Sequence, residues 1–179
     1  MRIIAGTWRG RRIPVLNAEG LRPTKDMVRE TLFNWLTPRM AGARCLDMFA
    51  GSGALGFEAA SRGASHVLML EQQAILVKHL RTQKDLLNAT QIEIQQVDSL
   101  QYLASLQQIF DIVFIDPPFT ALNMQQVLAV LHSSQCLTAH TLLYIEQSAA
   151  QGLPALPSGW HYERQKQSGD VVYGLVAIN

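Results

Sequence analysis

Four short apolar runs, separated by helical patterns, each end in an acidic residue: Asp47, Glu71, Asp98 and Asp116. Apolar runs that alternate with helical segments predict β-α-β units, which build a parallel sheet with right-handed crossovers. The carboxyl ends of parallel strands lie at one edge of the sheet, where open α/β sheets bind ligands. The four acids together therefore predict a ligand site. Any single one could be an ordinary strand end or a helix cap, as Asp98 before Ser99 could be.

The first of these runs leads into a glycine-rich turn. Gly51, Gly53 and Gly56 have the spacing G-x-G-x-x-G, in which glycines let the backbone approach a ligand closely. Such a turn serves a dinucleotide or S-adenosylmethionine, and the alternative is a tight strand-to-helix turn without a ligand. Asp47 favours S-adenosylmethionine, because a carboxylate there would repel a pyrophosphate and attract an ammonium group. Glu71 stands where the second strand of a doubly wound fold holds a ribose.

The fourth run, residues 110–115, ends in Asp116-Pro117-Pro118-Phe119. An ionised Asp116 accepts hydrogen bonds only, and the two prolines have no N–H to donate. Pro118 also holds Pro117 in an extended conformation. A rigid set of acceptors beside an aromatic ring suits a planar group that carries an NH₂, such as the exocyclic amine of a nucleobase. The alternative is a strand that ends in a proline turn.

The beginning of the chain is basic. Residues 1–44 hold nine Lys or Arg and three acids, whereas the remainder holds six and eleven. This asymmetry predicts a nucleic-acid contact at the basic end, where arginines would bind phosphates and a tryptophan would stack on an unpaired base. The alternative is a solvated arm whose tryptophan packs into the core. The predicted contacts are Trp8, Arg9, Arg11 and Arg12, with Arg22, Lys25 and Arg29 able to reach either RNA or the cofactor site.

The remaining segments supply a scaffold. We expect a hairpin over residues 2–5 and 11–16, and a closing antiparallel hairpin over 161–166 and 171–178. Thr24 is the expected N-cap of a helix. The predicted inner stripe of that helix is Met27, Val28, Thr31, Leu32, Trp35 and Leu36.

The composition fits one domain with its own core. The chain has 179 residues, of which 48% are hydrophobic, and no apolar run approaches the roughly 20 residues of a membrane span. No apolar signal-peptide core follows the N-terminal arginines. We expect Cys45 and Cys136 to be buried thiols rather than a disulfide or metal ligands, and the histidines show no metal-ligand spacing. A cytoplasmic monomer without a metal is therefore expected.

These motifs resemble a known enzyme class. The segment LDMFAGSGALGFEA, together with Glu71, Asp98 and DPPF, is similar to the class I S-adenosylmethionine-dependent methyltransferases, and DPPF is typical of the amino-group methylators. RIIAGTWRGRRI followed by RPTKDMVRETLFNWL resembles the bacterial 16S ribosomal RNA (guanine-N2)-methyltransferase family over nearly the whole chain. The resemblance implies N2-methylguanosine as product and a small-subunit particle as substrate. It also implies a Rossmann-like, doubly wound sheet of seven strands, mostly parallel, with an antiparallel last strand.

The expected organisation is one methyltransferase domain, residues 1–179, in which residues 1–40 form a basic extension and 41–179 a cofactor-binding catalytic core. The expected catalytic residues are Asp116, Pro117 and Phe119. The expected cofactor contacts are Asp47, Phe49, Ala50, Gly51, Ser52, Gly53, Gly56, Glu71, Asp98 and Ser99. Three alternatives stay open: a DNA adenine-N6 methyltransferase, a protein glutamine methyltransferase, and a non-catalytic RNA-binding factor of ribosome assembly.

Overall fold

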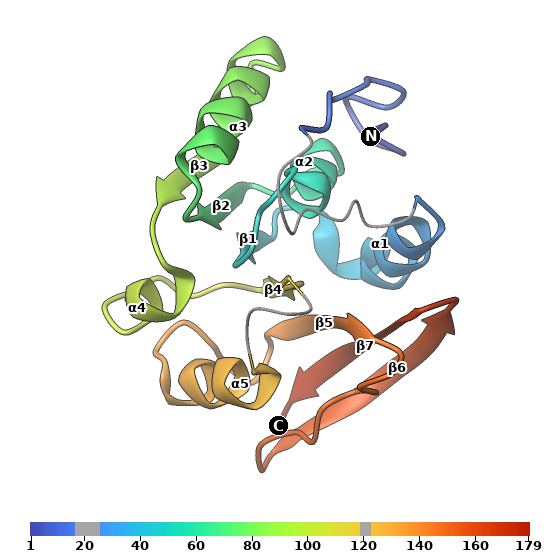
Figure 1. Cartoon of the computed structure of the whole chain (residues 1–179), viewed down its shortest axis with the longest axis vertical. Helices are drawn as coiled ribbons and strands as arrows, with labels where there is room; N and C mark the ends of the chain where they lie inside the picture. Colours follow the sequence, from blue (N-terminus) through green and yellow to red (C-terminus); the bar gives the residue numbers. More distant parts are fainter. Residues whose placement is uncertain (17–25, 119–122) are drawn as a thin grey trace.

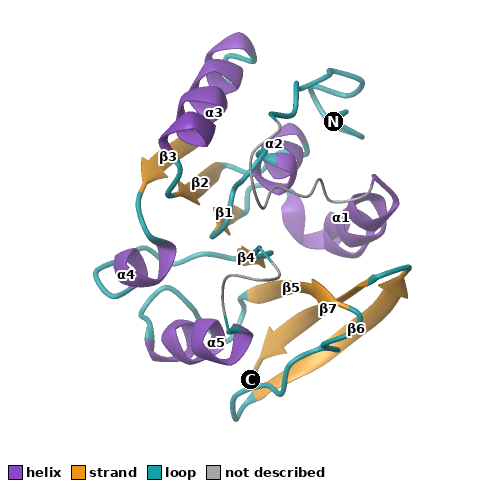
Figure 2. Ribbon diagram, in the orientation of Figure 1, coloured by secondary structure: helices purple, strands orange, loops and turns teal. Residues whose placement is uncertain are grey.

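The computed structural model describes residues 1–16, 26–118 and 123–179, and within them one seven-stranded sheet with helices on both faces (Figures 1 and 2). The strands are β1 (Arg44–Asp47), β2 (His66–Glu71), β3 (Ile92–Gln96), β4 (Ile112–Ile115), β5 (Leu142–Ser148), β6 (Trp160–Ser168) and β7 (Val171–Ile178). The helices are α1 (Asp26–Met40), α2 (Ala54–Ser61), α3 (Ala74–Leu86), α4 (Ser99–Leu103) and α5 (Met124–Ser133).

The strand order is β3-β2-β1-β4-β5-β7-β6. Strands β1 to β5 pair in parallel, and β7 lies antiparallel between β5 and β6. The predicted doubly wound, mostly parallel sheet with an antiparallel last strand is confirmed, as is the closing hairpin. After β1 the sheet grows in one direction through β2 and β3, and in the other from β4. The boundary between β1 and β4 is therefore the topological switch point, where such sheets bind ligands.

The apolar core of the described residues consists of two clusters, one on each face of the sheet, because side chains alternate between the faces along each strand. In β4, Ile112 and Phe114 join the cluster beneath α1, α2 and α3, whereas Val113 and Ile115 join the one beneath α4 and α5. Successive side chains of a strand point to opposite faces, so an apolar strand covered on both sides is buried throughout. Both predicted thiols, Cys45 and Cys136, are free and buried.

The buried stripe of helix α1 shares Val28, Leu32 and Leu36 with the predicted one and differs from it at other positions. Met27 is 65% exposed, so its predicted place in the core is wrong. Arg29 is fully buried instead, because its guanidinium donates to the Arg2 carbonyl (2.7 Å) and to Asp26 Oδ1 (2.6 Å), and a buried charge needs such partners. Arg29 therefore does not face a surface that RNA could reach. The buried positions of α1 are Val28, Arg29, Leu32, Phe33, Leu36 and Met40.

The N-terminal segment folds back on itself as predicted, through an isolated antiparallel bridge between Arg2 and Arg12. The Ile3 amide donates to the Arg11 carbonyl (2.9 Å), and both Ile3 and Ile13 are buried. Thr24, the expected cap, lies outside the described residues. No helix among the described residues combines the length and the apolarity needed to cross a membrane.

Candidate active site

The acidic strand ends lie side by side because the strands that carry them are neighbours. Asp47 is the last residue of β1 and is paired with Met69 of β2 on one side and with Phe114 of β4 on the other. Glu71 ends β2, and Asp116 follows β4 directly. The structure thus brings the predicted cofactor turn and the predicted amine-binding residues together at the switch point.

Glu71 holds the glycine turn from the neighbouring strand. Its Oε2 accepts the Gly51 amide at 2.9 Å, and its Oε1 accepts the Gln73 amide at 2.8 Å. The turn itself needs glycine, since Gly51 and Gly53 have φ values of 51° and 80° in the left-handed region. The Ala50 amide also donates to the Leu70 carbonyl of β2 (3.0 Å). The turn is therefore fixed to β2 by one backbone and one side-chain contact.

Asp47 lies beneath the turn and contacts the start of α2. It is 2% exposed, and its Oδ2 accepts the Gly56 amide at 3.0 Å. Burial raises the pKa of Asp47 to about 7, although the amides of Gly56 and Phe49 act against this rise. A Cβ at Gly56 would lie 2.3 Å from Met69 Cε and 3.2 Å from Asp47 Oδ2, so any larger residue there would require Met69 to move. Close packing of α2 on β1 and β2 thus explains this glycine.

Asp98 and Ser99 connect the third strand to the turn. Asp98 is exposed and caps α4, since its Oδ1 accepts the Gln101 amide at 3.0 Å. The alternative interpretation of Asp98 as a helix cap is therefore confirmed, and its contact with a cofactor stays a prediction. Ser99 is buried and its hydroxyl donates to the Met48 carbonyl, which places α4 against the segment that follows β1.

Asp116 is half-buried, Pro117 is buried, and Phe119 lies outside the described residues. A residue that the sequence reasoning missed stands beside them: Glu146 of β5, which is 4% exposed. Its Oε2 accepts the Tyr144 hydroxyl at 2.6 Å. Burial, followed by the nearby charges of Glu146 and Asp116, holds the pKa of Tyr144 well above its usual value. The sequence does carry a signal for this residue, because Glu146 follows the apolar run of β5 just as the four predicted acids follow theirs.

The basic arm is docked on α2, the helix that follows the glycine turn. Glu58 of α2 is fully buried, and its two carboxylate oxygens accept the amides of Ile4 (2.8 Å) and Ala5 (3.0 Å). Ser61 adds three hydrogen bonds to the backbone of the arm: its carbonyl accepts the Thr7 amide (2.8 Å), and its hydroxyl accepts the Trp8 amide (3.0 Å) and donates to the Ala5 carbonyl (2.6 Å). The arm therefore has a defined position relative to the cofactor turn.

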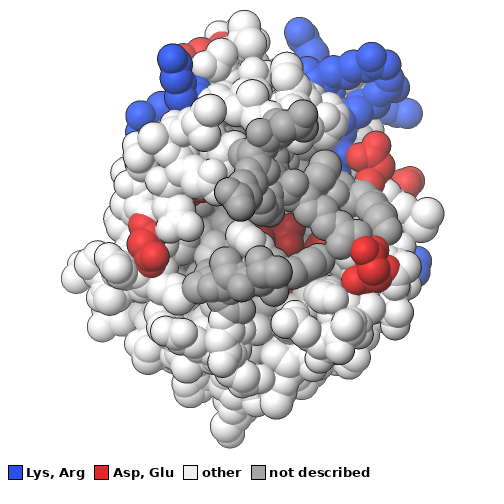
Figure 3. Space-filling model, viewed as in Figure 1, with Lys and Arg blue, Asp and Glu red and all other residues white. Residues whose placement is uncertain are grey.

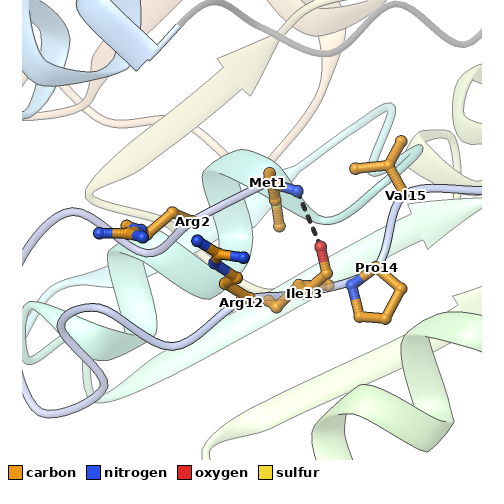
Figure 4. Close-up of a pocket in the computed structure, with 6 residues that line it drawn as sticks. All are labelled: Met1, Arg2, Arg12, Ile13, Pro14 and Val15. Carbon is orange, nitrogen blue, oxygen red and sulfur yellow. Dashed lines mark hydrogen bonds between the residues drawn. The ribbon is translucent and has the colours of Figure 1, made fainter.

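The predicted RNA-binding arginines are exposed on this arm, and Figure 3 shows Lys and Arg gathered over the N-terminal segment. Arg2 and Arg12 line a pocket with Met1, Ile13, Pro14 and Val15, in which the Met1 ammonium donates to the Ile13 carbonyl (Figure 4). Trp8 is half-buried and packs against the core, which agrees with the alternative prediction for that ring. Arg22 and Lys25 lie outside the described residues. Within the described ranges, no group of three or more His, Cys, Asp or Glu is placed to hold a metal ion.

Comparisons with known proteins agree over nearly the full length. The family model described as Conserved hypothetical protein 95 matches residues 1–177. A Haemophilus influenzae protein named ribosomal RNA small subunit methyltransferase D is 44% identical over 179 residues, which cover 98% of this chain and 92% of that protein. The Escherichia coli K12 protein of the same name is 41% identical over 175 residues, covering 98% and 88%.

A solved structure of a putative methyltransferase from Escherichia coli superposes with a TM-score of 0.93 at 38% identity, covering 100% of this chain and 98% of that one. The fold, the sequence identity and the matched length therefore all relate this chain to the same group of proteins. The chain belongs to the family described as Conserved hypothetical protein 95 and groups with the proteins named ribosomal RNA small subunit methyltransferase D.

Proposed function

We propose that this chain methylates the exocyclic N2 amino group of a guanine in 16S ribosomal RNA, with S-adenosylmethionine as methyl donor. The observation that carries the proposal is the meeting of a carboxylate-held glycine turn with Asp116-Pro117 at the ends of β1, β2 and β4. Relatives at 41% and 44% identity are named small-subunit rRNA methyltransferases. Guanine N2 rests on the resemblance of residues 2–13 and 22–36 to the guanine-N2 enzymes.

The residues of the turn fit a cationic cofactor that carries hydroxyl groups. S-adenosylmethionine supplies an electrophilic methyl group on a positively charged sulfur. Glu71 keeps lone pairs for ribose hydroxyls, because a carboxylate offers about four acceptor positions and the two amides use two. Asp47 keeps the turn in place through Gly56 and adds to the acidic character that disfavours a pyrophosphate. The proposed further contacts are Phe49, Ala50, Ser52, Gly53, Asp98 and Ser99.

Asp116 and the Pro117 carbonyl act on the amine. A guanine NH₂ is a weak nucleophile because its lone pair is delocalised into the ring. Two acceptors that hold its two protons fix its position and direct the lone pair away from the ring plane. The Asp116 carboxylate also stabilises the positive charge that develops on the nitrogen, whose proton leaves after transfer. Phe119 stacks on the base in this proposal.

The substrate side of the proposal follows from the arm. Arg9, Arg11 and Arg12 contact phosphates, and the target base leaves its stack to reach Asp116. Residues 1–40 thus position the RNA, and residues 41–179 hold cofactor and amine as one catalytic unit. We further propose that the chain acts as a cytoplasmic monomer on an assembled small-subunit particle.

The test is methyl transfer from labelled S-adenosylmethionine to small subunits from cells that lack the protein, with naked rRNA and DNA in parallel. Nucleoside mass spectrometry should find N2-methylguanosine from the ribosomal substrate. N6-methyladenine in DNA would identify a DNA adenine methyltransferase instead. An assembly factor without catalysis would transfer no methyl group to any substrate.

The Asp116→Ala variant separates amine binding from cofactor binding. We expect a loss of roughly 10²–10³-fold in turnover, with cofactor affinity nearly unchanged. Glu163→Ala, which removes an exposed acid of β6, is the control and should keep full activity. Equal loss of turnover and of cofactor affinity in Asp116→Ala would contradict this division of roles.

A further inference from the structure

Strand β5 carries a second acid beside the proposed amine site. Strands β4 and β5 are parallel and in register, with Ile115 opposite Ile145 at the end of the ladder. The next residues along the two strands are Asp116 and Glu146, which therefore stand at the same level on neighbouring strands. Adjacent strands lie about 4.8 Å apart, so two side chains on one face at one level are near neighbours.

The two acids share a face of the sheet. Phe114 and Tyr144 precede them by two positions, and their rings are 6.5 Å apart on the face covered by α1. Residues two apart in a strand point the same way, so Asp116 and Glu146 extend this row. The charge of Asp116 reaches the buried Tyr144, whose hydroxyl is bonded to Glu146, which agrees with this placement.

Packing alone does not explain the surroundings of Glu146. Its partner across the antiparallel ladder is Tyr173, whose ring lies 6.2 Å from that of Tyr144. The Tyr173 hydroxyl is buried and has no hydrogen-bond partner within the part of the chain that the structure describes. Buried polar groups without partners are rare. A core selected for stability alone would not hold the Glu146 carboxylate beside the unsatisfied Tyr173 hydroxyl, whereas a site that binds a polar ligand would.

The chemistry of the purine edge selects a role for this carboxylate. Guanine presents two neighbouring donor groups on its Watson–Crick edge, the N2 amine and N1–H. Adenine presents an amine beside N1 as well, but its N1 carries a lone pair and no hydrogen. A carboxylate next to the amine acceptors attracts N1–H of guanine and repels the N1 lone pair of adenine.

We propose that Glu146 accepts N1–H of the target guanine, held for this purpose by Tyr144, and so selects guanine over adenine. This inference rests on the proposed function, because it requires Asp116 and Pro117 to bind the amine. Sites built to bond a polar group reject analogues that lack it strongly, by up to about 10⁴–10⁵-fold. Discrimination at N1 should therefore be large enough to measure.

The test replaces the target guanine by 2-aminopurine, which keeps the 2-amino group but has a lone pair at N1. The methylated position is first mapped, and rRNA with either base there is made by splinted ligation and assembled into small subunits. The wild-type enzyme should have a kcat/KM at least about 10²-fold higher for guanine. Glu146→Gln should lower kcat/KM for guanine and reduce this ratio at least tenfold, because the Gln amide can donate to N1 of 2-aminopurine.

The decisive readout is the ratio of kcat/KM for guanine to kcat/KM for 2-aminopurine, since a merely structural loss would lower both values together. Glu163→Gln makes the same charge change on the exposed face of β6 and should keep the wild-type ratio. An active Glu146→Gln with the wild-type ratio would overturn the inference. If that variant does not fold, Tyr144→Phe takes its place. This variant should lower the ratio of the two kcat/KM values, and an unchanged ratio would overturn the inference as well. Absence of transfer from the wild type to guanine would instead overturn the proposed function.

Discussion

Gly6→Ala tests whether the basic arm is rigidly docked, and Gly10→Ala is its matched control. Both glycines have positive φ, 83° and 82°, so alanine costs about 1–2 kcal/mol of backbone strain at either position. A Cβ at Gly10 meets nothing within 4 Å, whereas one at Gly6 would lie 1.8 Å from the Ser61 carbonyl oxygen. Only Gly6→Ala forces the arm away from α2.

The size of the difference follows from the contacts that would break. Displacement of the arm breaks the bond from the Thr7 amide to the Ser61 carbonyl and that from the Trp8 amide to the Ser61 hydroxyl, and strains the bonds of Glu58 to Ile4 and Ala5. Each bond contributes about 1 kcal/mol net. We expect Gly10→Ala to lose about 1–2 kcal/mol and Gly6→Ala about 3–5 kcal/mol in total.

Two measurements are needed, because the arm can open without global unfolding. Urea denaturation reports the free energy of unfolding, and amide hydrogen exchange reports protection at Thr7 and Trp8. In Gly6→Ala the exchange at these amides should become fast, and affinity for the small subunit should fall while cofactor affinity stays. Equal stability and equal exchange in the two variants would refute a docked arm.

Two further predictions concern buried acids. Glu58→Ala leaves the amides of Ile4 and Ala5 and the Arg62 guanidinium without their carboxylate, so urea denaturation should show a loss of about 3–5 kcal/mol in the free energy of unfolding. The exposed control Glu30→Ala should lose less than about 0.5 kcal/mol, and similar losses in both variants would contradict the role of Glu58. Asp47 has a folded pKa raised to about 7, above that of the unfolded chain, so its contribution to stability is present below about pH 4 and is lost as the pH rises to about 7. Asp47→Asn should therefore become more stable relative to the wild type as urea titrations move from pH 4.5 to 8, and a constant difference would show that burial does not disfavour the charged carboxylate.

The fold could be predicted because its signals are local. Apolar runs, the glycine turn and the proline pair depend on a few neighbouring residues, and alternation of strands with helices leaves few topologies. The stripe of α1 was predicted less well. Burial of Arg29 in place of Met27 depends on the Arg2 carbonyl, 27 residues away, which no helical periodicity reveals.

The candidate site shows the same division. The sequence indicated that acids follow strands β1 to β4, and the structure places three of them at adjacent strand ends around the switch point. Glu146 was not predicted, although it also closes an apolar run, because no glycine or proline motif adjoins it. The pairing of β5 with β4 makes Glu146 a neighbour of Asp116, and that pairing exists only in the folded sheet.

The sequence by itself determined the sheet type, the glycine turn, the rigid acceptors after β4 and the basic character of the arm, because each arises from residues in direct succession. Only the tertiary structure decided what each acid contacts. Glu71 meets the turn 20 residues earlier and Glu58 meets the arm 54 residues earlier. Such contacts depend on which chain segments the core brings together, since a carboxylate removed from water requires donors wherever the fold supplies them.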